Sequence, residues 1–527
     1  MDIDVIVTGA GPTGLMLACE LALAGVRTRV LERRAEPHRN SRALTLHARS
    51  VELMDQRGLV DRFLPLGRTA PGWHFSALPT HLDFSALDSR HGYTLFLAQA
   101  RTEALLAERA AELGVEILRG HEVVAVRQDD DGVEAEVRGP CGTETLRGTE
   151  APRGTETLRG TETPRGTKTL RARYLVGCDG ARSAVREAAG IGFPGTDETF
   201  AGVLGDFAVF APDPAALDAL RAQGVLIAPL EDGPTRLVYI DPERMRVPAR
   251  EPVTVEEFRA SLVRLCGSDC GVAEPRWLSR FGNATRLAER YRSGRILLAG
   301  DAAHIHFPAG GQGLNTGLQD AVNLGWKLAA AVAGWAPPGL LDSYDAERNP
   351  VGRAVTENTE VQALLAELTL VEQYRRPALA LRALVDELLG MAEVNRRLAA
   401  RVSGLGTVYP ATTPGADPLV GRRMPDIGLT AAGSDATRVY DLLPAGRFVH
   451  LDLAGDPEFE ASVAPGWGSR VTPVTVTGRD DRPDLAGVTE ILVRPDGHIA
   501  WATRRTAVGE RRDERAEALT AWAGKPS

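Results

Sequence analysis

The start of the chain alternates short apolar runs with a longer apolar segment. Residues 5–8 (VIVT) and residues 28–31 (TRVL) have the length of strands, and residues 15–24 between them have the length and composition of a buried helix. A helix that joins two short strands is typical of a βαβ unit, in which the strands are parallel. We therefore expect an α/β fold whose sheet begins near residue 5.

Later parts of the chain show different patterns. Three segments alternate apolar and polar side chains like antiparallel strands, namely residues 202–210, 224–229 and 235–240. Long apolar helices are expected from residue 340 to about 390 and again beyond residue 394. From about residue 410 the pattern returns to strand–turn–strand, with Asp496-Gly497 as a hairpin turn.

The turn after the first strand is rich in glycine. Gly9, Gly11 and Gly14 form the pattern G-x-G-x-x-G, and the second strand ends at Glu32, eighteen residues after Gly14. The first glycine permits a tight turn, the second lets a pyrophosphate approach, and the third lets the helix pack on the strand. Glu32 is placed to bind ribose hydroxyls, and Arg33 either faces the adenine or ribose or is solvated. This region predicts a Rossmann-type site for FAD or NAD.

A second glycine-rich loop follows another apolar strand. Residues 295–299 predict a strand that ends at Gly300-Asp301, and the Pro/Gly-rich residues 308–313 precede a helix that starts at about Leu314. The loop glycines remove Cβ atoms where backbone must approach a flat ligand. The helix start offers free N–H groups to the pyrimidine end of an isoalloxazine ring or to a phosphate. These features are what a flavin site requires.

A third motif lies between the first two. Residues 174–186, YLVGCDGARSAVR, predict an apolar strand, a turn at Asp179-Gly180, and a helix that carries Arg182 and Arg186. Arg182 either contacts a cofactor or is an ion-pair residue of the scaffold.

Together the three motifs resemble those of the class A flavoprotein monooxygenases, the p-hydroxybenzoate hydroxylase superfamily. The segment GDAAHIHFPAGGQGLN, residues 300–315, is most similar to the aromatic polyketide hydroxylases, a group that includes anhydrotetracycline hydroxylase and rifampicin monooxygenase. The resemblance covers essentially the whole chain. It implies the p-hydroxybenzoate hydroxylase fold: an α/β, Rossmann-type FAD domain, an inserted antiparallel-sheet substrate domain and a C-terminal thioredoxin-like domain. The implied cofactor is noncovalent FAD.

The resemblance also implies site residues outside the motifs. In this family an arginine equivalent to Arg42, a glutamine equivalent to Gln99 and the backbone at Val124 contact FAD. A loop that positions the flavin is expected at Pro308, Gly310 and Gly311. The full expected FAD-binding set is Gly9, Gly11, Thr13, Gly14, Glu32, Arg33, Arg42, Gln99, Val124, Asp179, Asp301, Gly313, Leu314 and Asn315.

Only one G-x-G-x-x-G follows a strand, so FAD takes the Rossmann site and NADPH is expected to bind transiently in a surface groove. The family chemistry is aromatic hydroxylation through a C4a-hydroperoxyflavin formed from reduced flavin and O2, here on a polycyclic aromatic polyketide. Three alternatives stay open: Baeyer–Villiger oxidation of a polyketide ketone, inactivation of an antibiotic and, in a different class, ligand sequestration by a non-catalytic flavoprotein. No catalytic side chain is assigned. The candidates near the cavity are His304, His306, Arg49, Tyr239 and His74.

The expected FAD domain is discontinuous. It comprises residues 1–72, 94–186 and 284–400, and the substrate domain comprises residues 73–93 and 187–283. Residues 410–527 are expected to form the thioredoxin-like domain, for which packing and homodimer contacts are the expected roles. This last segment contains no cysteine, which excludes thiol redox chemistry there.

Residues 142–171 depart from the family pattern. They consist of five copies of a six-residue unit, from GTETLR to GTKTLR, where the family has a simple hairpin that one copy would complete. The period is too short for a solenoid of helical repeats. We favour a flexible or ribbon-like surface excursion produced by replication slippage over a partner-binding element.

Composition narrows the classes of partner. The 61 basic and 70 acidic side chains give a net charge of −9, which argues against nucleic-acid binding. No apolar run has the length of a membrane span, and the first strand starts too early for a signal peptide, so we expect a cytoplasmic protein without a membrane partner. The five cysteines are expected to be free thiols. Cys266 and Cys270 lack the second ligand pair of a zinc site.

Overall fold

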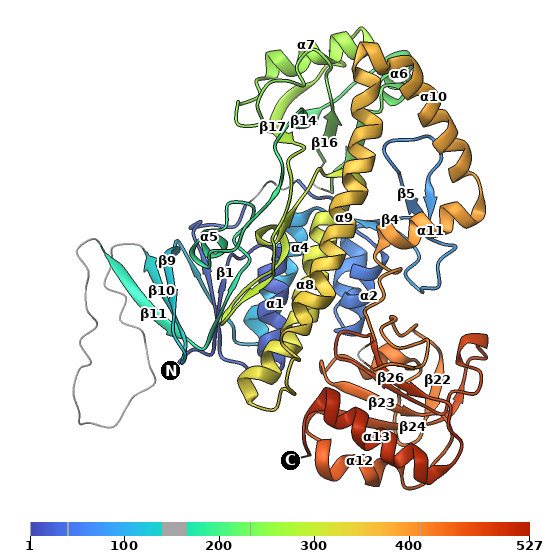
Figure 1. Ribbon diagram of the computed structural model, residues 1–527. Helices are drawn as coiled ribbons and strands as arrows, with labels where there is room; N and C mark the ends of the chain where they lie inside the picture. The colour runs from blue at the N-terminus through green and yellow to red at the C-terminus, as the bar shows by residue number, and fades with distance from the viewer. Residues whose placement is uncertain are drawn as a thin grey trace.

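A computed structural model describes residues 2–38, 40, 42–139, 166–231, 233–411 and 413–526 (Figure 1). The N-terminal βαβ unit is present: strands β1 (Val5–Thr8) and β2 (Thr28–Glu32) are parallel, and helix α1 (Pro12–Leu23) joins them. They belong to a six-stranded sheet with the order β19-β20-β12-β1-β2-β8. The remaining strands of this sheet are β8 (Glu116–Arg119), β12 (Tyr174–Gly177), β19 (Arg292–Ser293) and β20 (Ile296–Leu298).

Strands β1, β12 and β20 bring the three sequence motifs to one edge of this sheet. They are neighbours and mutually parallel, so the turns that follow Thr8, Gly177 and Leu298 lie side by side. Helix α8 (Gln312–Ala333) packs against α1, and helix α4 (Gln99–Glu112) packs against α1 as well. A ligand is expected at the carboxyl edge of such a sheet.

A four-stranded antiparallel sheet lies above that edge (Figure 1). Its order is β15 (Leu226–Pro229), β16 (Thr235–Tyr239), β14 (Ala201–Val209) and β17 (Ala273–Gly282), which confirms the three strands expected from the alternating segments. Its outer face packs on α6 (Pro214–Ala222) and α7 (Val255–Cys266). Phe207 and Leu237 point into that core, so the alternate positions, such as Leu204 and Val238, face the Rossmann sheet.

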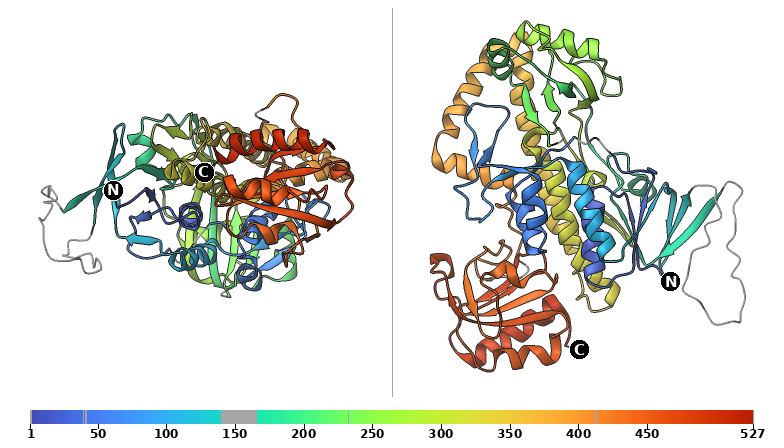
Figure 2. Two further views of the ribbon diagram at one scale, coloured as in Figure 1. Left: turned by 90° about the horizontal axis from the view of Figure 1, so that it is seen from below. Right: turned by 180° about the vertical axis from the view of Figure 1, so that it is seen from behind.

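The expected apolar helices after residue 340 are three in number. Helix α9 (Ser343–Glu367) runs beside the antiparallel sheet, α10 (Glu372–Leu389) turns back outward, and α11 (Ala392–Ser403) returns toward the Rossmann region (Figures 1 and 2). A small apolar cluster that includes Trp73 and Leu389 joins α10 and α11 to the segment before α4.

The C-terminal region has its own five-stranded sheet and core. The strand order is β22 (Leu429–Ala431), β24 (Val471–Arg479), β23 (Phe448–Asp452), β25 (Glu490–Val493) and β26 (Ile499–Thr503). Helices α12 (Phe459–Trp467) and α13 (Val508–Ala523) accompany it. The hairpin turn at Asp496-Gly497 is confirmed: β25 and β26 are antiparallel, and Gly497 has φ 76°. The domain boundaries drawn from the sequence stay a prediction, with which these separate cores agree.

Of the five six-residue repeats, the last (residues 166–171) lies within the described residues. It forms strand β11 (Thr167–Ala172), which pairs with β10 (Val133–Arg138) in a three-stranded sheet that also contains β9 (Glu122–Gln128). Arg138 and Thr167 face each other at the end of this ladder. Residues 140–165 lie outside the described ranges, so the expectation of a flexible or ribbon-like excursion there stays a prediction.

Three expectations from composition can be compared with the structure. In the described ranges no helix is long and apolar enough to cross a membrane. The same residues contain no cluster of side chains suited to a metal ion. The four cysteines described there are free thiols, which confirms the expectation for them, and the sulfur atoms of Cys266 and Cys270 lie 3.5 Å apart without a disulfide.

Candidate active site

A large cavity lies between the carboxyl edge of the Rossmann sheet and the antiparallel sheet. Its volume is about 750 Å³. Thirteen of the residues expected from the sequence line it: Gly9, Gly11, Thr13, Glu32, Arg33, Arg42, Gln99, Asp179, Asp301, Pro308, Gly311, Gly313 and Leu314. Segments far apart in the sequence therefore meet around one space, as the three motifs predicted.

The glycines of the first motif lie where the packing roles of the pattern require them. Gly9 has φ 103°, and a Cβ there would lie 2.3 Å from the carbonyl oxygen of Cys178, so only glycine fits. A Cβ on Gly14 would lie 2.0 Å from the carbonyl oxygen of Gly9, which explains the close packing of helix on strand. A Cβ on Gly11 would meet nothing within 4 Å, so this backbone is open to the cavity.

Glu32 is held at the cavity wall by backbone donors. The backbone N–H groups of Ala10 and Arg34 donate to its two carboxylate oxygens, each at 2.9 Å. These bonds fix the carboxylate next to the glycine-rich turn. The arrangement agrees with the predicted role in binding ribose hydroxyls, and the adjacent Arg33 also lines the cavity.

Asp179 presents a buried oxygen without a partner. One carboxylate oxygen accepts from the backbone N–H of Val185 at 3.2 Å, whereas Oδ1 is buried and has no hydrogen-bond partner among the described residues. Desolvation raises the pKa of this carboxyl, and hydrogen bonds from Ser183 and the helix start partly offset that effect. A buried acceptor without a partner is costly, so this atom is suited to a ligand donor. Arg182 lines the cavity, whereas Arg186 bonds to the carbonyl of Ala302 and belongs to the scaffold.

Asp301 and Arg42 face the same space from different elements. Asp301 is accessible from the cavity but surrounded by protein, and desolvation raises the pKa of its carboxyl, while His304 and Arg42 lower it. The Arg42 guanidinium donates to the carbonyl of Arg280 at 3.3 Å, which ties the Rossmann side to the antiparallel sheet. An acidic and a basic side chain thus line this part of the cavity together.

The loop after Pro308 requires glycine at two consecutive positions. Gly310 has φ 71° and Gly311 has φ 64°, a left-handed conformation that other residues rarely adopt. Gly310 does not line the cavity; its carbonyl instead accepts a hydrogen bond at 2.7 Å from Nε2 of His47. His47 was not among the residues expected from the sequence, since it lies 263 positions from Gly310.

Asn315 also proves to hold the loop rather than to line the cavity. Its side-chain oxygen accepts from the backbone N–H of His47 at 2.7 Å, and its amide donates to the carbonyls of Thr45 and Gly311. The side chain of Asn315 is therefore used by the scaffold, and the expected contact of this residue with the cofactor stays a prediction. Val124 does not line the cavity either; the wall reaches this strand at Glu122 and Val123. Gly14 has the packing role described above.

The two histidines of the loop differ from each other. His304 is 1% exposed, and its Nε2 bonds at 2.8 Å to Asp320, which also accepts from the backbone N–H of Gly300. This makes His304 part of the scaffold. His306 lines the cavity, and desolvation lowers its pKa to about 4, so the imidazole is neutral at neutral pH. Arg49, Tyr239 and His74, which were candidates for the cavity, do not line it.

The antiparallel sheet supplies a mostly apolar wall with one ion pair. Leu204, Leu226, Val238, Trp277 and Phe281 line the cavity from this side. Arg236, also a lining residue, forms a two-pronged salt bridge with Asp206, both contacts being 2.7 Å. Asp206 and Arg236 are only 4% and 2% exposed, and a third guanidinium nitrogen donates to the carbonyl of Arg42. The pair is neutral as a whole.

Comparison with known protein families identifies this architecture. Residues 2–359 match the model of an FAD binding domain, and residues 417–526 match the model of the C-terminal region of aromatic-ring hydroxylases. The chain belongs to the FAD-dependent aromatic-ring hydroxylases. It is accordingly an FAD-dependent monooxygenase with the mixed α/β fold of the p-hydroxybenzoate hydroxylase type. This confirms the family, the fold and the cofactor predicted from the sequence.

Individual relatives of this hydroxylase match over the full length. It is 45% identical to 12-dehydrotetracycline 5-monooxygenase/anhydrotetracycline 6-monooxygenase of Streptomyces rimosus, with 100% of both chains covered. It is 43% identical to rifampicin monooxygenase of Streptomyces venezuelae, over 99% of this chain and 98% of that one. The solved structure of an anhydrotetracycline hydroxylase from Streptomyces rimosus superposes with a TM-score of 0.84 at 43% identity, again with 100% of both chains covered.

The residues of the cavity fit FAD. The open backbone at Gly11 suits a pyrophosphate, Glu32 suits the adenosine ribose, and the unpartnered oxygen of Asp179 suits a hydroxyl or N–H donor. The start of α8, with Gly313 and Leu314 in the cavity wall, offers backbone N–H groups to the flavin ring.

Proposed function

We propose that this hydroxylase uses NADPH and O2 to add one hydroxyl group to a polycyclic phenol of the aromatic polyketide type. Bound FAD, once reduced, would supply the activated oxygen. The tetracycline-type substrates named for the full-length relatives support the substrate class, and the wall of the cavity supports it independently. NADPH would bind transiently at the surface, because the single G-x-G-x-x-G site is used by FAD.

In this proposal the protein binds and orients the flavin and the substrate, and it excludes water from the cavity. No side chain performs nucleophilic chemistry. The Pro308–Gly311 loop and the start of α8 fix the flavin ring, while the antiparallel sheet covers the substrate. His306 lies in the wall as a neutral imidazole. Its Nδ1 donates to the carbonyl of Phe307 at 2.8 Å, so its unpartnered Nε2 can accept a hydrogen bond from a phenol. Exclusion of water favours hydroxylation over loss of peroxide.

The salt bridge in the wall carries the argument about substrate. A small carboxylate such as p-hydroxybenzoate needs a buried cation that is free to pair with it. Arg236 is the buried cation of the substrate wall, but Asp206 already neutralises it through two short contacts. Trp277, Phe281 and the aliphatic side chains offer flat apolar surface instead. The wall is therefore suited to a large, neutral, multi-ring ligand.

The proposal is tested by NADPH oxidation with a series of phenols. We expect slow oxidation without substrate, strong stimulation by phenols of three or four fused rings, and no stimulation by single-ring hydroxybenzoates. The matched variant is Asp206→Asn, which leaves Arg236 unneutralised and should shift stimulation toward carboxylated phenols. Strong stimulation of the wild type by p-hydroxybenzoate would reject the substrate class. The absence of stimulation by any aromatic compound would favour a ligand-sequestering flavoprotein.

Baeyer–Villiger oxidation and antibiotic inactivation remain the alternatives within oxygenase chemistry. The first would place the new oxygen inside a ring or chain as an ester, which product connectivity distinguishes from a hydroxyl group. The second is supported by the similarity to rifampicin monooxygenase and would appear as drug resistance in a host that expresses the protein. No feature of the described cavity favours either alternative over hydroxylation.

A further inference from the structure

Helix α10 carries apolar side chains that the other described residues do not cover. Among the described residues thirteen large hydrophobic side chains are exposed, and eight of them lie between Val361 and Met391. Six of these eight are 41–56% exposed and lie on or directly after α10: Leu379, on another side of the helix, and five that share one stripe, namely Tyr374, Leu381, Leu384, Leu388 and Met391. Such a concentration on one short segment marks an interaction surface.

The spacing of these side chains is that of a coiled-coil seam. The five residues follow one another at intervals of seven, three, four and three, and Pro377 occupies the remaining seam position between Tyr374 and Leu381. We call these six residues the α10 seam. Another side of the helix packs on the protein: Ala378 and Leu389 are buried, and Arg382 donates to the carbonyl of Ser76 at 3.0 Å.

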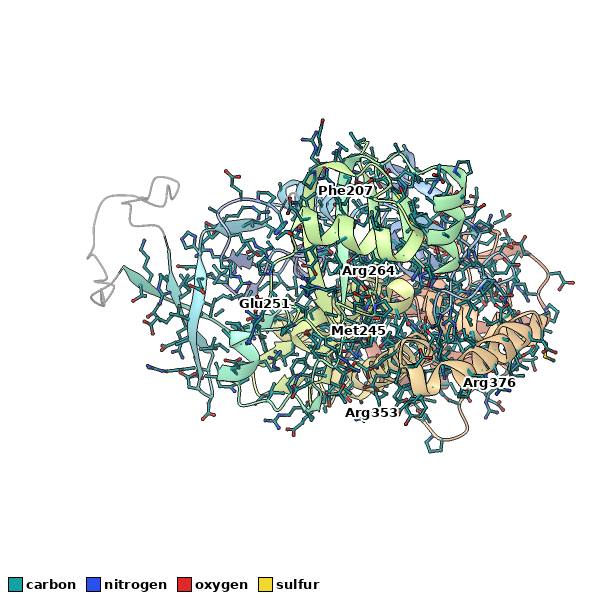
Figure 3. All side chains as sticks on the ribbon, turned by 90° about the horizontal axis from the view of Figure 1, so that it is seen from above. Phe207, Met245, Glu251, Arg264, Arg353 and Arg376 are labelled. Atoms are coloured by element: carbon teal, nitrogen blue, oxygen red, sulfur yellow. The ribbon has the colours of Figure 1, made fainter. Side chains whose placement is uncertain are left out.

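The position of α10 leaves the seam accessible. The helix lies at the outer edge of the molecule, away from the Rossmann sheet and from the C-terminal region, both in Figure 1 and in the view from behind in Figure 2. Figure 3 shows the same from above, with Arg376 at the periphery.

Two charges border the seam on one flank. Arg376 lies near the start of α10 and Glu387 near its end, eleven residues or about three turns apart, so they lie on the same side of the helix. Both are exposed, and neither forms an ion pair within the described part of the chain. The flank is thus positive at one end and negative at the other.

We propose that the α10 seam joins two copies of this chain in a two-fold symmetric homodimer with antiparallel α10 helices. A two-fold axis between Arg382 and Ala383 places Tyr374 opposite the partner's Met391, Pro377 opposite the partner's Leu388, and Leu381 opposite the partner's Leu384. Every seam residue then faces another seam residue, as an isologous interface requires.

The charges select the antiparallel direction. With this axis, Arg376 and the partner's Glu387 differ by only about 3 Å in height along the helices, within reach of both side chains. A parallel arrangement would instead place each of these charges beside its own copy, which is unfavourable. A lipid surface would favour a basic rim around the apolar stripe, and the seam lacks one. A second copy of the chain is therefore the occupant that matches both the apolar pattern and the charges.

The first test is sedimentation of the full-length, FAD-loaded protein at micromolar concentration. We expect a dimer. Leu384→Glu should weaken it at least about a hundredfold, because the change removes a buried leucine and adds a charge on both sides of the interface. Val508→Glu is the matched control: Val508 is 43% exposed but lies on α13, so the dimer should persist. Both variants should retain FAD.

A charge exchange tests the direction of the helices. Arg376→Glu and Glu387→Arg should each weaken the dimer severalfold, and the double variant should restore the affinity of the wild type. A monomeric wild type, a dimer unaffected by Leu384→Glu, or a double variant weaker than both single variants would overturn the proposal. So would a monomer that sediments with phosphatidylcholine vesicles, since the stripe would then serve a lipid surface.

Discussion

At the scale of single residues, a neutral histidine holds the Pro308–Gly311 loop, which is expected to position the flavin. His47 is fully buried, donates to the carbonyl of Gly310, and has a pKa that burial lowers to about 4. Its backbone N–H and the carbonyl of Thr45 are bound by Asn315. The loop conformation therefore depends on an imidazole that must stay uncharged.

This dependence predicts a loss of stability in mild acid. Below pH 6.5 an unfolded His47 binds a proton that the folded protein does not accept until about pH 4. The contribution of neutral His47 to the free energy of unfolding is therefore complete above pH 6.5. It falls as the pH approaches 4, by roughly 3 kcal/mol in total. The unfolding temperature should decline less between pH 7.5 and pH 4.5 for His47→Gln than for the wild type. At pH 7.5 the variant should already unfold at a lower temperature than the wild type. Equal slopes would contradict this role of His47.

Asp301 is the carboxylate placed beside the glycine loop, and its loss should weaken FAD binding. Asp301→Ala would remove the charge-assisted hydrogen bonds that we expect between this residue and the cofactor, which are worth ~1–3 kcal/mol. The dissociation constant for FAD, measured by quenching of flavin fluorescence, should rise about 5- to 150-fold. The unfolding temperature of the apoprotein should change little. An unchanged dissociation constant would exclude contact between Asp301 and the cofactor.

At the scale of elements, the sequence predicted what depends on local pattern. The βαβ unit, the glycine turns at Gly9 and Gly310 and the strands of the antiparallel sheet have periodicities or φ requirements that short segments reveal. The contacts of His47 with Gly310 and of Arg236 with Asp206 were not found, because they join positions 263 and 30 residues apart and arise only when the sheets assemble. The side-chain contacts of Asn315 were not found for the same reason: its partners include the segment around Thr45.

The hairpin at the six-residue repeats gives a prediction for one element. Deletion of residues 142–165 would join Arg138 to its register partner Thr167 through four residues, Gly139, Pro140, Cys141 and Gly166. Four residues are an ordinary hairpin loop, and loop length has a small effect on closure entropy, roughly 0.6 kcal/mol per doubling. The deletion variant should keep the FAD content and the turnover rate of the wild type. Loss of either would show that the repeat has a role in the enzyme.

At the scale of the whole molecule, buried ion pairs connect the turn at Gly300 to the C-terminal region. Asp320 accepts from Gly300 and His304 and pairs with Arg348, which donates to the hydroxyl of Tyr409 at 3.2 Å. Burial alone would raise the pKa of Asp320, but Arg348 and His304 outweigh it and lower the pKa. One residue earlier in α9, Glu347 pairs with Arg494, so the C-terminal region supports this helix directly.

Arg348 should therefore matter for stability and for FAD together. Arg348→Met leaves Asp320 as a buried charge without its main partner, a change that costs about 3–5 kcal/mol. The unfolding temperature should fall markedly, and FAD should dissociate more easily because the Gly300-Asp301 turn loses its support. Arg353→Met on the same helix is the control: this side chain is exposed, and the change should stay within about 0.5 kcal/mol. Similar effects of both variants would contradict the assigned network.

The central claim is that FAD, the glycine loop and the neutral substrate wall together hydroxylate a polycyclic phenol. The most direct measurement is the fate of ¹⁸O₂ during NADPH-dependent turnover of such a phenol, followed by mass spectrometry and NMR of the product. We expect the product to contain one ¹⁸O atom, as a hydroxyl group on a ring carbon, and an intact ring system. An ¹⁸O atom inserted as an ester oxygen, or hydrogen peroxide as the sole oxygen product, would contradict it.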